Sequence, residues 1–141
     1  MNIHLAVPEG KRTKSKLEVQ TKAIELLNYT TSICSNEKIF PKRHRWDISG
    51  RIVESAWMIH DDINTANSIF VSAKIDYEMR REHQIRALAY TARLLGQIDF
   101  AYVKFHIESR RIKYWTQLVV DERELLKRWK KSDSNRYKTY K

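Results

Sequence analysis

The sequence predicts an all-α fold in which residues 16–131 form an antiparallel up-down four-helix bundle. Four long segments carry apolar residues at steps of three and four, which places those residues on one face of a helix. The chain has 141 residues but only 3 glycines and 2 prolines, whereas a strand-and-turn protein needs these residues at its turns. The breaks between segments are short, as between antiparallel neighbours.

The first predicted helix covers residues 16–35 and follows residues 1–15, which we interpret as a basic flexible arm. The apolar stripe of this helix consists of Val19, Ala23, Leu26, Thr30 and Ile33. The pattern breaks at residues 36–42, where Phe40 precedes Pro41 and is therefore disfavoured from helical angles.

The second predicted helix covers residues 45–71 and has the clearest stripe: Ile48, Ile52, Ala56, Ile59, Ile63, Ala66 and Phe70. Gly50 lies within it, and a close contact with another helix is one reason to tolerate glycine there. Apolar side chains beside the stripe make the apolar face of this helix wider than one bundle core requires. They predict an oligomer interface formed by Trp46, Val53 and Trp57.

The third helix is predicted over residues 76–105, with a stripe of Ile85, Leu88, Ala92, Leu95, Asp99 and Tyr102, which is widened by Leu94, Ile98, Ala101 and Phe105. The fourth is predicted over residues 109–131, with Ile112, Trp115, Val119, Glu122, Leu126 and Trp129. Residues 132–141 have no stripe and are interpreted as a basic flexible tail.

The formal net charge is +10, and the positive excess lies in residues 1–45 and 106–141, whereas residues 46–105 are nearly neutral. Such a field attracts polyanions, so we expect binding to RNA, cDNA or a nucleic-acid enzyme. On the third helix, Tyr90 stands between two arginines in a polar stripe expected opposite the core. The predicted nucleic-acid or partner residues are Lys42, Arg43, Arg45, Arg86, Tyr90, Arg93, Arg110, Arg111, Lys113, Arg123, Lys127, Lys130 and Lys131.

Signals for catalysis are weak, and we expect a non-enzymatic protein without cofactor or metal. No two of the five histidines are three or four residues apart, and no Walker, G-x-S-x-G or G-x-G-x-x-G motif is present. Asp61 and Asp62 are expected to form a solvated patch. Asp99 and Glu122 fall within apolar stripes, so each needs a cationic partner if it is buried.

Cys34 lies on an apolar row and is expected to be a small core residue. A single cysteine cannot form an internal disulfide, no apolar run approaches a membrane span, and no signal-peptide pattern begins the chain. These features predict a cytoplasmic protein that does not enter the membrane.

Three stretches resemble a known family of four-helix bundles. They are Phe40-Pro41-Lys42-Arg43, the start from Ser15 to Ala23, and the ending that runs from Tyr114-Trp115-Thr116 to Leu125-Leu126-Lys127-Arg128-Trp129-Lys130-Lys131-Ser132. The first is similar to a helix junction in the group that contains the ribosomal-RNA intervening-sequence proteins and the accessory variability determinant (Avd) proteins of diversity-generating retroelements. The other two resemble Avd proteins in particular.

The resemblance implies a barrel-shaped homopentamer of four-helix bundles. It also implies a non-catalytic partner of a retroelement reverse transcriptase and its template RNA during mutagenic cDNA synthesis. The family's basic surface would then fall on Arg86, Arg93 and the clusters at the helix starts. Two alternatives remain: a stand-alone RNA- or rRNA-associated bundle, and a structural assembly protein whose charge serves only solubility. A small enzyme would depend on Asp99 and Glu122.

Overall fold

The computed structural model describes the backbone of residues 14–140 and the side chains of residues 16–140. This part of the chain is all-helical and contains no strand. The predicted arm at residues 1–15 lies almost wholly outside it. The elements in chain order are α1 (Lys14–Cys34), a 3₁₀ turn (Lys42–His44), a π turn (Arg45–Ser49), α2 (Gly50–Ser68), α3 (Lys74–Phe105), α4 (Ser109–Arg136) and a 3₁₀ turn (Lys138–Tyr140).

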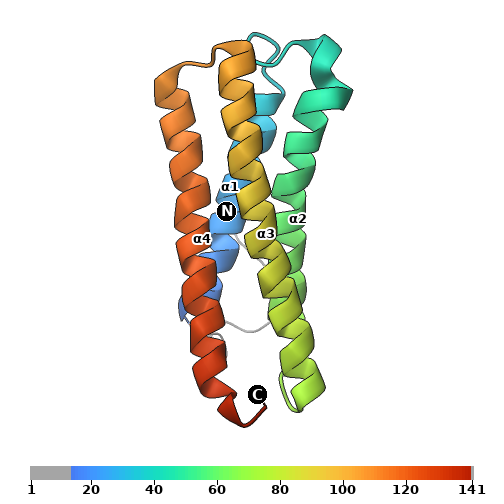
Figure 1. The fold of residues 1–141 in the computed structure, drawn as a ribbon, viewed down its shortest axis with the longest axis vertical. Coiled ribbons are helices and arrows are strands. Elements are labelled where there is room, and N and C mark those ends of the chain that lie inside the picture. Colours follow the sequence, from blue (N-terminus) through green and yellow to red (C-terminus); the bar gives the residue numbers. More distant parts are fainter. Residues whose placement is uncertain (1–13, 141) are drawn as a thin grey trace.

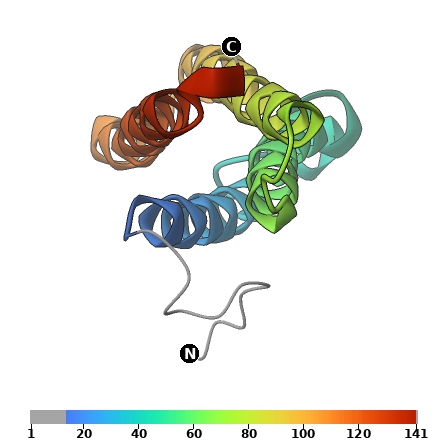
Figure 2. The ribbon, with the colours of Figure 1, turned by 90° about the horizontal axis from the view of Figure 1, so that it is seen from below.

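The four helices lie side by side along the long axis of the molecule (Figure 1). Each helix contacts the next in the chain, and α1 also contacts α4, so the helices surround a common centre (Figure 2). The α1–α2 and α3–α4 connections are at the upper end in Figure 1, and the α2–α3 connection is at the lower end. The four helices therefore form a helical bundle, as the sequence predicts. None of the described helices is both long and apolar enough to cross a bilayer.

The core contains the predicted stripes of α1, α2 and α4 except Phe70, which is 86% exposed because α2 ends at Ser68 and not at the predicted residue 71. Val19, Ile59 and Leu126 are fully buried, and so are the large rings of Trp115 and Trp129. A buried indole N–H usually has a hydrogen-bond partner, although Trp129 Nε1 has none among the described residues. Trp115 Nε1 donates a hydrogen bond to Thr30 Oγ1 on α1, at 3.0 Å. Cys34 is also buried, as predicted, and burial raises the pKa of its thiol to about 12, so the thiol is a poor nucleophile.

The second helix begins later than the sequence predicts, because residues Arg45–Ser49 form a π turn and α2 starts at Gly50. A Cβ atom at position 50 would lie 2.7 Å from the carbonyl oxygen of Arg45. Glycine is therefore required by the π turn that precedes it. The expected contact with another helix is not the reason.

The predicted face of α3 is correct only in part. Leu94, Ile98 and Ala101, which widen the predicted stripe, are fully buried together with Ala87 and Thr91. Ile85, Ala92 and Asp99 of the main predicted stripe are exposed. The helix carries apolar side chains on more than one face, so periodicity alone did not identify the buried face. Asp99 therefore needs no buried cationic partner.

The fourth helix continues past the predicted end at residue 131, so residues 132–136 are not a flexible tail. Asp133 is 2% exposed because it bonds to two side chains of α3. Its carboxylate accepts hydrogen bonds from Arg80 Nη2 at 2.9 Å and from Gln84 Nε2 at 2.8 Å, and its Oδ2 lies 2.8 Å from Arg80 Nε. The Arg80 guanidinium also stacks on the Trp129 ring, at 5.2 Å.

We predict that Asp133→Ala lowers the free energy of unfolding by about 3–5 kcal/mol, because it leaves the buried Arg80 guanidinium without its counter-charge. Urea unfolding followed by circular dichroism measures the change. Ser132→Ala, at an exposed position on the same turn, should change stability by less than about 0.5 kcal/mol. Equal stabilities for the two variants would contradict a structural role for the ion pair.

Candidate nucleic-acid interface

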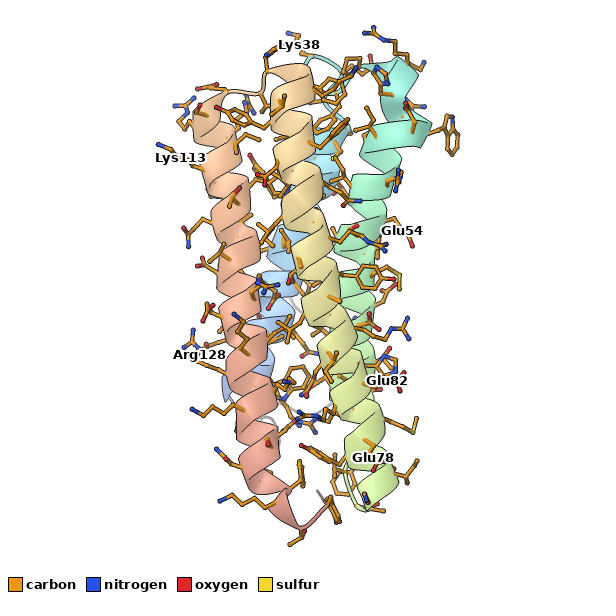
Figure 3. All side chains as sticks on the ribbon, in the orientation of Figure 1. Lys38, Glu54, Glu78, Glu82, Lys113 and Arg128 are labelled. Atoms are coloured by element: carbon orange, nitrogen blue, oxygen red, sulfur yellow. The ribbon has the colours of Figure 1, made fainter. Side chains whose placement is uncertain are left out.

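Basic side chains gather at the upper end of the bundle, where the α1–α2 and α3–α4 connections meet. Figure 3 shows Lys38 and Lys113 near this end. We call the following set, all exposed, the basic end: Lys38, Lys42, Arg43, Arg45, Lys104, Arg110, Arg111 and Lys113. It contains six of the predicted binding residues from two segments far apart in sequence.

Aromatic packing brings these two segments together. Phe40, in the α1–α2 connection, is 2% exposed and packs edge-to-face on Phe105 at the end of α3 and on Trp115 of α4, with centroid distances of 5.2 and 6.2 Å. The His44 ring lies 5.6 Å from Phe105. His106 then adopts a left-handed conformation with φ 52°, which ends α3 two residues before the cap of α4.

Most cations of the basic end are free of local neutralisation. Arg110 and Arg111 share Glu108, at 3.3 and 3.8 Å. The remaining members form no ion pair with a described carboxylate. The first turn of α4 contains no acidic residue, although carboxylates are the side chains that stabilise a helix N-terminus. Helix stability therefore does not explain the cations at this end.

A groove of about 530 Å³ lies beside the basic end, between the π turn with the start of α2 and the second half of α3. Its apolar lining includes Ile48, buried Ile52 and the exposed ring of Phe100. Its lining residues are His44, Asp47, Ile48, Arg51, Ile52, Arg93, Gly96, Gln97, Phe100 and Lys104. A second hollow of about 360 Å³ shares Arg51, Arg93 and Gln97 with it and reaches Trp46.

The polar stripe of α3 lies along the contact between α3 and α2. The sequence instead predicted that this stripe lies opposite the core. His83 Nδ1 lies 3.0 Å from Asp62 Oδ1, and Arg86 Nε lies 3.8 Å from the same oxygen. Asp62 is 4% exposed, so the predicted solvated patch is wrong for Asp62 and holds only for exposed Asp61. Arg86 thus balances a buried carboxylate while its own side chain remains half-exposed.

The other predicted α3 residues border the groove. The Arg93 guanidinium lies over the Tyr90 ring at 5.0 Å, so it covers a ring that is already half-buried. This contact leaves Tyr90 a poor stacking platform for a base, contrary to its predicted role. Arg93 itself is exposed.

The predicted residues of α4 divide into two groups. Arg123 is half-buried and donates hydrogen bonds to Leu88 O at 3.2 Å and Thr91 Oγ1 at 2.8 Å, so it joins α4 to α3 and is a structural residue. Lys127 lies 3.6 Å from Glu124, and Lys130 and Lys131 form no ion pair with a described carboxylate. The last three lie on the lower half of α4, away from the basic end.

The three predicted interface residues follow the outer side of the π turn and α2. Trp46 is 88% exposed, Trp57 is 43% exposed and Val53 is half-buried. An indole as exposed as Trp46 leaves a large apolar area in water. These side chains therefore leave an apolar surface exposed along the outer side of the π turn and α2.

Sequence reasoning missed Arg51, Phe100 and Lys104. Phe100 and Lys104 are one turn apart on α3, and Arg51 joins them only because α2 packs beside α3. Phe100 stood outside the predicted apolar rows of this helix, so no local pattern marked it.

Glu122 is the residue on which an enzyme reading would depend, since Asp99 is exposed. Glu122 is fully buried, and neither carboxylate oxygen has a hydrogen-bond partner among the described residues. Burial raises its pKa well above the ordinary value, an effect that nearby Lys22 opposes and Glu25 reinforces. Burial thus favours the protonated form of this carboxyl, and no cation lies within hydrogen-bond distance of it among the described residues. Within residues 16–140, no group of three potential metal ligands lies together.

No family model, no curated protein and no solved structure matches this chain.

We predict that Glu122→Gln raises stability at pH 7. Because the folded-state pKa is raised, folding takes up a proton above the unfolded value of about 4.3, and stability falls as the pH rises from there towards the folded pKa. Glutamine has the same shape and takes up no proton. Urea unfolding at pH 4 and 7 should show a gain at pH 7 that disappears near pH 4.

The control is Glu54→Gln, which neutralises an exposed glutamate of α2 (Figure 3) and should leave this pH dependence unchanged. A loss of stability on Glu122→Gln at pH 7 would mean that the carboxylate is ionised and paired.

Proposed function

We propose that the protein is a non-catalytic accessory subunit that binds a retroelement reverse transcriptase and its template RNA or cDNA and supports mutagenic cDNA synthesis. In this proposal, antiparallel bundles assemble into a barrel-like homopentamer in the cytoplasm. The observation that carries it is the basic end, where exposed cations from two connections lie together and most have no carboxylate partner. The resemblance to Avd proteins is the reason for proposing a reverse transcriptase as the protein partner.

The basic end would bind mainly to phosphates, and its affinity would depend little on the nucleotide sequence. Flexible lysines and arginines at the rim of a bundle can follow a phosphate backbone, and no short recognition helix is available for a DNA groove. Each phosphate contact releases counterions, so affinity should fall with salt. A subunit of this kind positions nucleic acid for an enzyme that performs the chemistry.

The first test is co-expression with the reverse transcriptase of the same genome, followed by native mass spectrometry with template RNA. We expect a complex of one polymerase with several copies of this chain, and its mass gives the copy number. Clean separation of the two proteins, together with retained RNA binding, would favour the stand-alone RNA-associated bundle. Loss of both interactions would favour a structural assembly protein.

A charge-removal experiment tests the basic end. The double variant Lys42→Gln/Arg43→Gln should reduce the slope of log affinity against log salt for single-stranded RNA by about 1.4, since each lost contact contributes about 0.7. The control Arg136→Gln/Lys138→Gln removes the same charge at the other end of the bundle. Equal effects of the two variants would indicate diffuse attraction without a defined interface.

The oligomer interface is tested with Trp46 and Trp57. In the proposed assembly a second copy covers these rings, so Trp46→Ala/Trp57→Ala should lower the oligomer mass in native mass spectrometry at micromolar concentration. The control is Phe70→Ala, because Phe70 is 86% exposed but lies in the α2–α3 connection at the opposite end. An unchanged mass in the double variant would remove this face from the interface.

A further inference from the structure

The groove between the π turn and α3 combines three features that the basic end alone does not explain. It has a volume of about 530 Å³, an exposed aromatic ring and three cations. We propose that this groove holds one unstacked base of a single-stranded nucleic acid against Phe100, with the flanking phosphates on Arg51, Arg93 and Lys104. The inference rests on the nucleic-acid-binding part of the proposed function.

The shape of the groove fits a flat ring. Phe100 is 56% exposed, an unusual state for a phenyl ring. Gly96 stands one turn before it on the same side of α3, and a Cβ atom there would meet nothing within 4 Å. Glycine thus leaves the space beside the ring open. The volume is within the range of about 300–1,000 Å³ that holds small organic groups.

The charges of the groove fit phosphate. Arg51, Arg93 and Lys104 are exposed and form no ion pair with a described carboxylate. The one carboxylate in the lining, Asp47, already lies 3.2 Å from His44 Nδ1. Arg93 and Lys104 stand on either side of Phe100 and are separated by about 16 Å along the helix axis, given 1.5 Å per residue. Their long side chains can therefore contact phosphates before and after a base held on Phe100.

The amide of Gln97 joins the two sides of the groove. Its Nε2 donates to the carbonyl oxygen of Arg51 at 3.3 Å, whereas its Oε1 is enclosed by protein atoms and is not open to the groove. The groove therefore offers a base a ring to stack on and no hydrogen-bond acceptor from Gln97, so little base selectivity is expected.

A single strand fits these features better than a duplex or an acidic peptide. In a duplex the base faces are stacked and cannot reach Phe100, whereas single strands present them to aromatic side chains. An acidic peptide would satisfy the cations but has no regular alternation of flat rings and phosphates. Polyglutamate serves as the probe for that occupant.

The experiment measures fluorescence anisotropy of a labelled single-stranded RNA of about 16 nucleotides with the full-length protein. A duplex of the same length and polyglutamate are measured in parallel, and circular dichroism confirms that each variant is folded. Three pairs of variants differ in the groove and in a matched control. They are Phe100→Ala with Phe70→Ala, Gly96→Leu with Gly96→Ala, and Arg93→Gln with Arg136→Gln.

We expect Phe100→Ala to raise the Kd for single-stranded RNA by about 5- to 150-fold, the range for loss of one base-stacking contact. Phe70→Ala should leave this Kd unchanged, and so should Gly96→Ala, which keeps the groove open. Gly96→Leu should weaken binding without any change in charge. Duplex affinity should be the same in the wild type, Phe100→Ala and Gly96→Leu.

The proposal is overturned if Phe100→Ala and Gly96→Leu bind single-stranded RNA as the wild type does. It is also overturned if they lose polyglutamate binding while keeping RNA binding. If the wild type binds no RNA or DNA even at about 50 mM salt, the nucleic-acid part of the proposed function falls together with the groove. If the groove variants lose RNA but the reverse transcriptase never joins the complex, the groove stands and the polymerase role falls.

Discussion

The burial of Phe40 against Phe105 and Trp115 is the contact on which the upper end of the bundle depends. Without this contact, the α1–α2 connection would not be held against the ends of the helices. With Phe40 in the core, the 3₁₀ turn that follows Pro41 is held beside the end of α3. The cations of residues 42–45 are therefore held at the same end of the bundle as those that begin α4 (Figure 1). An aromatic contact in the core thus determines where the surface charge is concentrated.

Polar groups in the interior fix how the helices pair. Asp133 joins α4 to Arg80 and Gln84 of α3, Asp62 joins α2 to His83, and Trp115 joins α4 to Thr30 of α1. Breaking one of these buried contacts leaves a polar group without a partner, and a shift of one helix along another would break them. They select one arrangement among several that apolar packing alone would allow. Other buried polar groups have no such partner among the described residues: Glu122, whose pKa burial raises, the side-chain amide of Asn67 and Nε1 of Trp129.

The helices themselves could be predicted because apolar periodicity reports burial directly, and α1, α2 and α4 each bury one clear stripe. The errors arose where a polar residue is buried or an apolar one is exposed. Asp133 looks like part of a tail and Asp62 like part of a solvated patch until Arg80 and His83 are placed beside them. Their partners are distant in sequence, so no local pattern could have identified these pairs.

The same reasoning explains why the buried face of α3 was predicted only in part. It also explains why α3 supplies much of the groove lining. Its exposed side chains include Ile85, Phe100 and Val103, which the bundle leaves in water. A helix that only completed a core would carry polar residues at such positions. Local sequence rules tend to fail where a surface serves a second purpose. The exposed ring of Phe100, the glycine before it and the cations of α3 without a carboxylate partner share one face of α3 beside the groove. This face is where the proposed second role of the surface would lie.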